Sequence, residues 1–375
     1  MNGGRAVLVG PACRSGRIMQ IDHWDGLSGG CVRIEPDAGS ARSDEDRLDE
    51  LVAGCLTAAG CAAGTWTPTD LRYPGLHATA HRTQRARRTA TPAVERSRTG
   101  APHAAGAEDR AVRGALEQTE EQVRAMVLRA RRSQARARSV ERRTGWAVDL
   151  APSGEDHLAQ SVRRALRQAP APADGFRGER TAEVTDWSAE QREVFEEGCR
   201  ILQAAWPQML AELRVTLRQV TLLGGWGIDG FTDFTVHGAV FVNSRRLGDQ
   251  GTEGLAGRFR LVEALVHEGT HNRCDAAAAS AAFLRTSGAQ ELASTPLRAD
   301  PRPLAGLFQQ VAVLARSVLL YRRLPDGPAV RDRHAVLLEQ GGRGAATLRG
   351  RAGALTDAGR ELLDQAEAVF ATGAP

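Results

Sequence analysis

The clearest hydrophobic pattern in the chain runs over residues 258–285. Apolar residues recur there at the three- and four-residue spacing of a helix with one buried face. They are Phe259, Leu261, Val262, Leu265 and Val266. The alanines at 276–279 are strong helix formers and continue the same segment. The pattern therefore predicts a helix that packs against the rest of the protein through one face.

Other segments show the same helical period. Residues 188–213 predict an amphipathic helix, with Ser188 and Gln191 forming a capping-box start and Pro207 kinking or ending its first part. Residues 304–324 predict a second strong helix that ends at Pro325. Further helices are expected at 108–143, 152–168, 329–340 and 356–371.

Two short segments change to the pattern of β-strands. They are residues 215–222 and 234–243, separated by a glycine-rich turn at 224–230, and they predict a small β-hairpin. Residues 286–303 contain three prolines and are expected to form a loop. The expected fold is therefore mainly α with a small β-hairpin, an α+β class.

The N-terminal third lacks a clear period. Gly, Ala, Arg, Thr and Pro dominate residues 1–105, and only residues 41–55 suggest a short helix. We expect a low-complexity, disordered extension over 1–105, followed by a mainly helical domain over 106–375.

Charge and cysteine content change this picture little. All 49 basic residues are arginine, which indicates a coding bias and weakens any argument for nucleic-acid binding. Residues 82–143 hold 16 arginines against 7 acidic residues, which fits a solvated linker or arm. Six cysteines include no CxxC pair, and we expect no signal peptide and no apolar stretch of about 18 residues. We expect a cytoplasmic protein with no membrane and no nucleic-acid partner.

Within the first helix, residues 267–271 read HEGTH, an instance of the HExxH metal motif. His267 and His271 lie one turn apart on the same helix face, so their imidazoles can meet at one divalent metal. Glu268 lies beside them, as a base or as a hydrogen-bond acceptor that supports the ligands. A histidine pair on an apolar helix can also be part of a core, but the helical context favours a metal site.

Two ligands leave the chemistry open. In a zinc metallopeptidase a following glutamate completes the site, and Glu291 stands 20 residues after His271. Glu268 would then activate zinc-bound water. Glu291 lies between Gly288 and Pro296, a poor setting for a rigid helix, and it also fits a surface carboxylate.

Two strings of residues resemble the HExxH-type, 2-oxoglutarate-dependent peptide β-hydroxylases, a family that modifies ribosomal peptides in natural-product biosynthesis. The first string is LVHEGTH at residues 265–271. The second is PLRADPRPLAGL at residues 296–307, an arginine followed by DPRPL and the start of a helix. The second is the more specific one, since peptidases have no reason to carry it.

The resemblance implies iron(II), 2-oxoglutarate and hydroxylation of an unactivated β carbon in a peptide or a carrier-bound amino acid. His267 and His271 would hold the iron, which needs further open positions for oxygen and 2-oxoglutarate. A bidentate arginine suits the distal carboxylate of 2-oxoglutarate. The candidates for that arginine are Arg298, Arg302 and Arg316.

The third ligand is where this chain departs from the family. The family pattern implies a histidine about five residues past the leucine of DPRPL, and Gln309 stands there. Gln309 could ligate weakly, Glu268 or Glu291 could substitute, or the position could stay open to a halide or water. The competing hypotheses are a zinc-dependent metallopeptidase and a binding module whose basic segment, residues 82–143, contacts an acidic partner.

Overall fold

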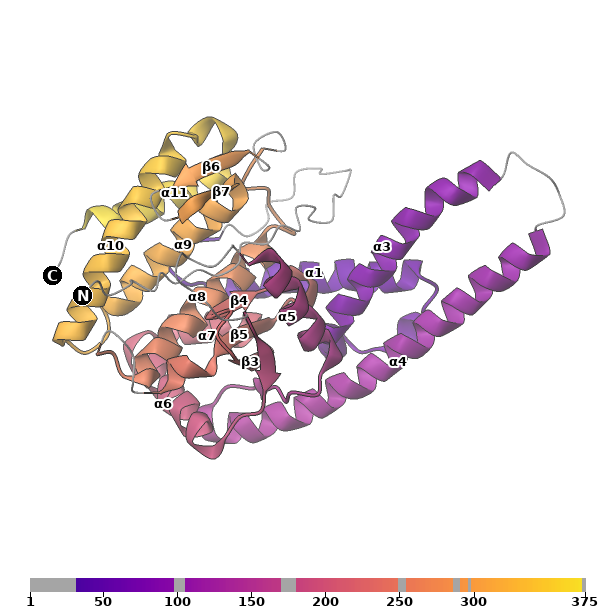
Figure 1. Cartoon of the computed structure of the whole chain (residues 1–375), viewed down its shortest axis with the longest axis horizontal. Coiled ribbons are helices and arrows are strands. Elements are labelled where there is room, and N and C mark those ends of the chain that lie inside the picture. Colours follow the sequence, from indigo (N-terminus) through magenta and orange to yellow (C-terminus); the bar gives the residue numbers. More distant parts are fainter. Residues whose placement is uncertain are drawn as a thin grey trace.

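The computed structural model describes residues 32–97, 105–169, 180–248, 254–285, 291–295 and 298–372. Within these ranges it contains eleven α-helices and seven short strands (Figure 1). The predicted class, mainly α with a small β component, is therefore confirmed.

A five-stranded mixed sheet lies inside the main body. β3 (Gln219–Gly224) runs parallel to β5 (Ala239–Asn243) and to β1 (Asp149–Leu150), whereas β2 (Glu183–Thr185) pairs antiparallel with the end of β3. β4 (Gly230–Thr232) pairs antiparallel with β5. The predicted pairing of the two longer strands in one hairpin is wrong, because they are parallel neighbours. The hydrophobic pattern of a strand does not encode its direction, and the hairpin is formed by β4 and β5.

Alternate residues of β3 and β5 face opposite layers. One set belongs to the main hydrophobic core: Val220, Leu222, Val240 and Val242. The other set shares a cluster with Leu158 and Val162 of α5 (Asp156–Gln168): Leu223, Ala239 and Phe241. Both faces of the sheet are covered, which explains why these strands are apolar almost throughout.

The amphipathic segment before the sheet forms two helices. Ser188 and Gln191 make the predicted capping box at the start of α6 (Ala189–Ala205), with each side chain accepting the other's backbone N–H. α6 ends at Trp206, and α7 (Pro207–Thr216) begins at Pro207, where the fixed φ of proline suits a first helical turn. The predicted break at Pro207 is confirmed.

α8 (Gly257–Ala277) carries the HEGTH sequence and lies among several elements. It packs against α6, α7, β4, β5 and α9 (Leu304–Tyr321). A Cβ added to Gly269 would come within 2.2 Å of Leu213 Cδ2. α7 therefore approaches α8 closely because residue 269 has no side chain.

Much of the segment expected to be disordered is helical. α1 (Ala38–Ala58) confirms and extends the short helix suggested at 41–55. α2 (Pro68–Leu71) and α3 (Pro74–Ser97) are helical as well, so the expectation of disorder is wrong for these residues, while residues 1–31 lie outside the described ranges. α1 packs against α7 and α8. The hydrophobic period is weak because several buried positions are polar or charged. They include Asp44, Glu45, Asp49 and His77.

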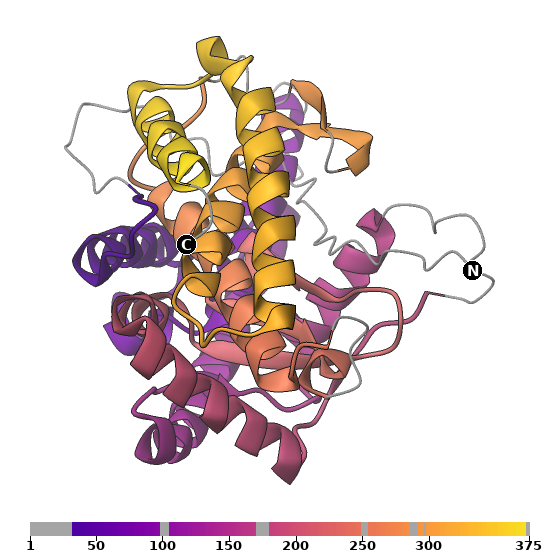
Figure 2. The ribbon, with the colours of Figure 1, turned by 90° about the vertical axis from the view of Figure 1, so that its left-hand side faces the viewer.

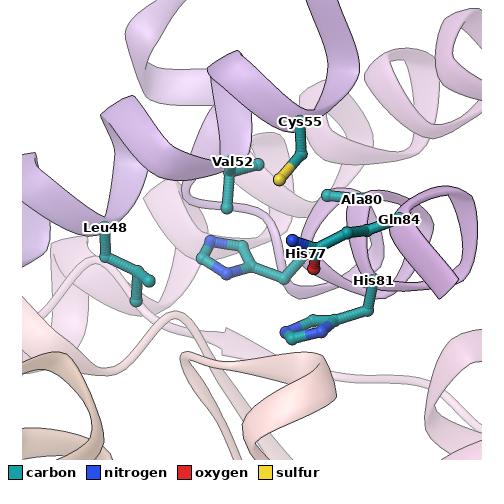
Figure 3. Close-up of a pocket in the computed structure, with 7 residues that line it drawn as sticks. All are labelled: Leu48, Val52, Cys55, His77, Ala80, His81 and Gln84. Atoms are coloured by element: carbon teal, nitrogen blue, oxygen red, sulfur yellow. The ribbon is translucent and has the colours of Figure 1, made fainter. Parts of the chain in front are cut away.

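α3 and α4 (Ala105–Thr144) project side by side from the body as a two-helix arm (Figure 1). The long charged helix predicted over residues 108–143 is confirmed by α4. A cavity of about 10 Å³ lies between α1 and α3, lined by side chains that include Cys55, His77 and His81 (Figure 3). This is roughly the room that one water molecule needs, so the cavity is too small for a substrate.

The C-terminal part is a group of three packed helices: α9, α10 (Pro328–Arg349) and α11 (Asp357–Ala371) (Figure 2). β6 (Leu292–Thr295) and β7 (Arg298–Pro303) form a two-stranded sheet where a loop was predicted. Its prolines are compatible with a short sheet in which both strands are edges. In the described part of the chain, α9 alone is long and apolar enough to span a membrane, so the expectation of no apolar stretch of about 18 residues is wrong. The helix is mostly buried, as a core helix is.

Candidate metal centre

Three side chains of α8 converge at one point. The potential ligand atoms of His267, Glu268 and His271 lie within 4.8 Å of one another, and no other such group of three occurs among the described residues. The two imidazole rings are 5.2 Å apart between centroids and inclined by 62°. Both rings are partly exposed, whereas Glu268 is buried. This arrangement can hold a divalent metal from one side and leave its other side open.

Glu268 is held by β4. The Thr232 hydroxyl donates to Glu268 Oε2 at 2.7 Å, and a Cβ on Gly230 would lie 3.0 Å from Oε1. Burial raises the pKa of Glu268 to about 7, although the Thr232 hydrogen bond and the Arg246 charge act in the opposite direction. The carboxyl group can therefore exchange a proton near neutral pH, as a general base must. A bound cation would favour its carboxylate form.

His271 has a hydrogen-bond partner on the next core helix. Its Nδ1 lies 2.9 Å from Oε1 of Gln309 on α9, and Gln309 Nε2 donates to Asp275 Oδ1 at 2.9 Å. Gln309, the predicted third metal ligand, is thus placed against the His271 ring and bridges it to Asp275.

The two imidazoles are in the form that binds metals. Burial lowers the pKa of His271, and burial together with the charge of Arg246 and the neighbouring His271 holds the pKa of His267 well below its usual range. Neutral imidazoles keep a lone pair, and metal binding does not first have to displace a proton.

Arg246 is a cation beside the cluster that the sequence did not single out. It belongs to η3 (Ser244–Leu247), a single 3₁₀ turn that follows β5 and packs on α8. Its side chain is partly buried and makes no hydrogen bond or ion pair with another described residue. Its charge lowers the pKa of Glu263, Glu268 and His267. The one sequence signal for Arg246 is its position three residues after β5, a strand that packs against α8.

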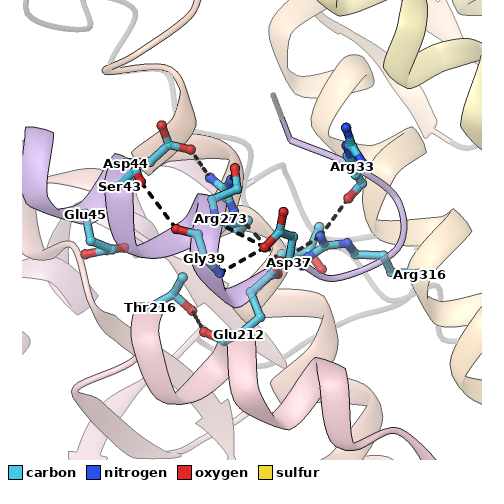
Figure 4. Close-up of polar contacts among 12 residues, drawn as sticks. Arg33, Asp37, Gly39, Ser43, Asp44, Glu45, Glu212, Thr216, Arg273 and Arg316 are labelled. Carbon is cyan, nitrogen blue, oxygen red and sulfur yellow. Dashed lines mark hydrogen bonds and ion pairs between the residues drawn. The ribbon is translucent and has the colours of Figure 1, made fainter. Parts of the chain in front are cut away.

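Arg316 does not behave as the predicted co-substrate anchor. It is fully buried, and its guanidinium donates to both carboxylate oxygens of Glu212, at 2.5 and 3.2 Å. The same group also donates to the carbonyl oxygens of Arg33 and Ile34 (Figure 4). A guanidinium with these four contacts supports the packing of the N-terminal segment on α9, which argues against a role in holding 2-oxoglutarate.

The remaining predicted residues lie around β6 and β7. Glu291 forms an ion pair with Arg351, so its carboxylate faces a surface arginine and does not join the His267 cluster. Arg298 and Arg302 lie on β7, opposite Thr295 and Ala293 of β6, and their side chains are outside what the structure describes. Their proposed role therefore remains a prediction.

Two contacts of the site had no clear signal in the sequence. Thr232 and Asp275 are ordinary polar residues, and their roles follow from the packing of β4 and α9 on α8. No protein-family model and no curated protein matches this chain. The family resemblance therefore remains an expectation that depends on the two motif strings.

Proposed function

We propose that this protein is an iron(II)- and 2-oxoglutarate-dependent oxygenase. Its reaction would hydroxylate an unactivated β carbon of a residue in a ribosomal peptide or of a carrier-bound amino acid. The observation that supports this best is the meeting of two neutral imidazoles and a buried carboxylate on α8.

The donor set fits iron(II). Iron(II) accepts imidazole and carboxylate ligands and needs vacant positions for oxygen and an acid co-substrate. The partly exposed rings of His267 and His271 can supply the two nitrogen ligands while one side of the metal stays accessible. The DPRPL string also leads directly into α9, whose Gln309 contacts His271.

The reaction balances with the reagents named. The carbon–hydrogen bond of the substrate becomes carbon–hydroxyl, 2-oxoglutarate is oxidised to succinate and carbon dioxide, and each product acid or alcohol receives one atom of O₂. Bound iron and 2-oxoglutarate supply this oxidising chemistry. The chain supplies position: His267 and His271 hold the metal, and Thr232 orients Glu268, which ligates the metal or accepts a proton.

Arg246 is the described residue best suited to hold the distal carboxylate of 2-oxoglutarate. It is partly buried beside the site and forms no hydrogen bond or ion pair with another described residue, although its charge acts on Glu263 and Glu268. A guanidinium presents paired donors that match a carboxylate. In this proposal Arg246 takes the role that the sequence suggested for Arg316.

The decisive experiment measures succinate formation. Protein reconstituted with iron(II) should convert 2-oxoglutarate to succinate, with a product 16 Da heavier when a suitable precursor peptide is present. Each hydroxylation adds one oxygen atom to the peptide, so its mass should rise by roughly 16 Da each time. The variant His271→Ala, which lacks one of the two proposed nitrogen ligands, gives the background level of succinate formation. Succinate no higher than that background with every precursor tested, in a protein that retains only zinc, would rule out the proposal.

A zinc metallopeptidase is the second candidate. The raised pKa of Glu268, about 7, in the second position of an HExxH sequence favours it, because a peptidase needs a base for zinc-bound water. The peptidase would cleave a generic unstructured peptide, and both a chelator and Glu268→Gln would abolish cleavage. The oxygenase would leave that peptide intact.

A further inference from the structure

We propose that Gln309 is a positioning residue that holds His271 as the tautomer with its hydrogen on Nδ1, so that Nε2 faces the metal. The inference rests on the metal site of the proposed function but not on the reaction catalysed there. It replaces the sequence-based expectation that Gln309 is itself a ligand.

The first step concerns the orientation of the Gln309 side chain. Its two ends lie 2.9 Å from Asp275 Oδ1 and 2.9 Å from His271 Nδ1. The structure directs the amide nitrogen of Gln309 to Asp275 Oδ1, and the charge of His237 favours the carboxylate form of Asp275. A carboxylate only accepts hydrogen bonds. The amide NH₂ must therefore face Asp275, which turns the amide oxygen toward His271.

The second step concerns the imidazole. An amide oxygen has no hydrogen to donate, so the contact of 2.9 Å requires that Nδ1 of His271 carries the hydrogen. In a neutral imidazole the other nitrogen then holds the lone pair. Nε2 is left as the metal-binding atom. A hydrogen bond from the second nitrogen is the usual way in which proteins orient a metal-binding histidine.

The third step concerns rigidity. His271 and Asp275 are one turn apart on α8, and Gln309 reaches them from α9. The two helices pack against each other, and both carry fully buried residues of the main core, such as Leu265 and Val311. A ligand tied to a second core helix loses little freedom when the metal binds, which favours binding.

A consequence for the coordination shell follows. With Gln309 behind the ring of His271, the described residues provide two imidazoles and at most the Glu268 carboxylate. Several positions then remain for small ligands, as an oxygen-activating metal requires. Gln309 would then orient a metal ligand, and its presence in place of a histidine would not mean that the metal site is lost.

The test measures metal affinity in matched variants. Gln309→Leu removes both hydrogen bonds, whereas Gln310→Leu makes the same change at the next position, which has no hydrogen bond to another described residue. Competition with a chromophoric chelator should show zinc and iron(II) bound roughly 10- to 100-fold more weakly by Gln309→Leu, with Gln310→Leu like the wild type. Equal affinities in the two variants would overturn the inference.

A second variant tests the acceptor itself. In Gln309→Glu the new carboxylate can still accept the hydrogen of His271 Nδ1, as carboxylates do for many metal-binding histidines. A positioning role therefore predicts that most of the metal affinity lost in Gln309→Leu returns in Gln309→Glu. An affinity as low as that of Gln309→Leu would contradict the inference while leaving the metal site intact.

The wild-type protein supplies a test without any substitution. Two-bond ¹H–¹⁵N spectra of the zinc-loaded protein distinguish the two histidine tautomers. We expect a protonated Nδ1 on His271, assigned by its loss in His271→Ala. A hydrogen on Nε2 of His271 would refute the positioning role of Gln309 but not the metal site. A wild-type protein that binds neither zinc nor iron(II) would refute the proposed metal site as well.

Discussion

The five residues of the HEGTH sequence divide chemistry and packing between them. His267, Glu268 and His271 present their polar atoms to one point, while Gly269 lets α7 approach and the Thr270 hydroxyl donates to the carbonyl of Val266 at 2.7 Å. A helix placed this deeply cannot adjust easily when one residue changes. The geometry of the His–Glu–His cluster therefore depends on the two intervening residues as well as on the three polar ones.

Arg246 is the residue whose replacement best tests the proposed co-substrate site. Arg246→Gln should raise the KM for 2-oxoglutarate roughly 10- to 100-fold, because a charge-assisted hydrogen bond is worth about 1.5–3 kcal/mol. The kcat at saturating co-substrate should change much less. Steady-state succinate assays at several 2-oxoglutarate concentrations would measure both constants.

The neighbouring arginine provides the control. Arg245 is exposed, pairs with Asp229 and stacks on Trp226, so Arg245→Gln removes the same charge at a place that does not face the cluster. Its KM should stay close to that of the wild type. If both variants raise the KM equally, the effect is one of overall charge and Arg246 is not the anchor.

At the scale of elements, the sequence predicted the helices after residue 105 well, but it missed α2 and α3 and the pairing of the strands. α8 and α9 have a regular apolar period, so their positions were recognisable. The direction of β5 relative to β3 could not be recognised, because a parallel and an antiparallel strand bury the same residues. α1 was missed over part of its length because it buries Asp44, Glu45 and Asp49, whose partners lie far away in sequence. The His–Glu–His geometry could be predicted from spacing alone; the contacts from β4 and α9 required the tertiary fold.

Replacing a helical glycine by alanine should have opposite effects at a crowded position and at an open one. Gly269→Ala places a Cβ where Leu213 now lies and should destabilise the protein by roughly 1–3 kcal/mol. Gly342→Ala adds a Cβ in α10 with nothing within 4 Å and should stabilise it by about 0.5–1 kcal/mol. Urea unfolding midpoints would show the two signs. A neutral Gly269→Ala would mean that α7 and α8 are less tightly packed.

Glu263 makes the packing of α8 sensitive to acid. It accepts hydrogen bonds from Tyr321 of α9, at 2.6 Å, and from Arg333 of α10. Burial alone would raise its pKa, but the charge and hydrogen bonds of Arg333 lower it to about 2 from an ordinary value of 4.5. A lowered pKa gives stability that is complete above pH 4.5 and is lost as the pH falls toward 2, on the order of 3 kcal/mol.

Equilibrium unfolding between pH 6 and pH 2 would measure this contribution. The wild type should lose stability below about pH 4.5, the ordinary pKa of the group. Glu263→Gln should be less stable at neutral pH and should have a flatter profile across the same range. Parallel profiles for the two proteins would show that other carboxylates account for the acid sensitivity.

At the scale of the whole molecule, one buried ionic cluster joins parts of the chain that are distant in sequence. Asp44 of α1, Glu212 of α7, Arg273 of α8 and Arg316 of α9 are all fully or almost fully buried (Figure 4). Two guanidinium and two carboxylate groups give no net charge, as a buried cluster requires. The segment that the sequence presented as an extension is thus part of the core that supports α8, and its removal would expose Arg273.

This cluster leads to the prediction that best tests the overall architecture. Asp44 and Asp46 are both on α1 and both bind an arginine, but the side chain of Asp44 is 1% exposed and that of Asp46 is 60% exposed. Asp44→Ala leaves Arg273 buried without its closest carboxylate, at 2.6 Å in the wild type, and should cost about 3–5 kcal/mol. Asp46→Ala leaves Arg72 partly solvated and should cost less than about 1 kcal/mol. Thermal and urea unfolding would measure the difference, and metal affinity should fall only in Asp44→Ala, because Arg273 and His271 share a helix turn. Equal small losses would mean that α1 does not support α8, and the N-terminal residues would then be the dispensable extension that their composition suggests.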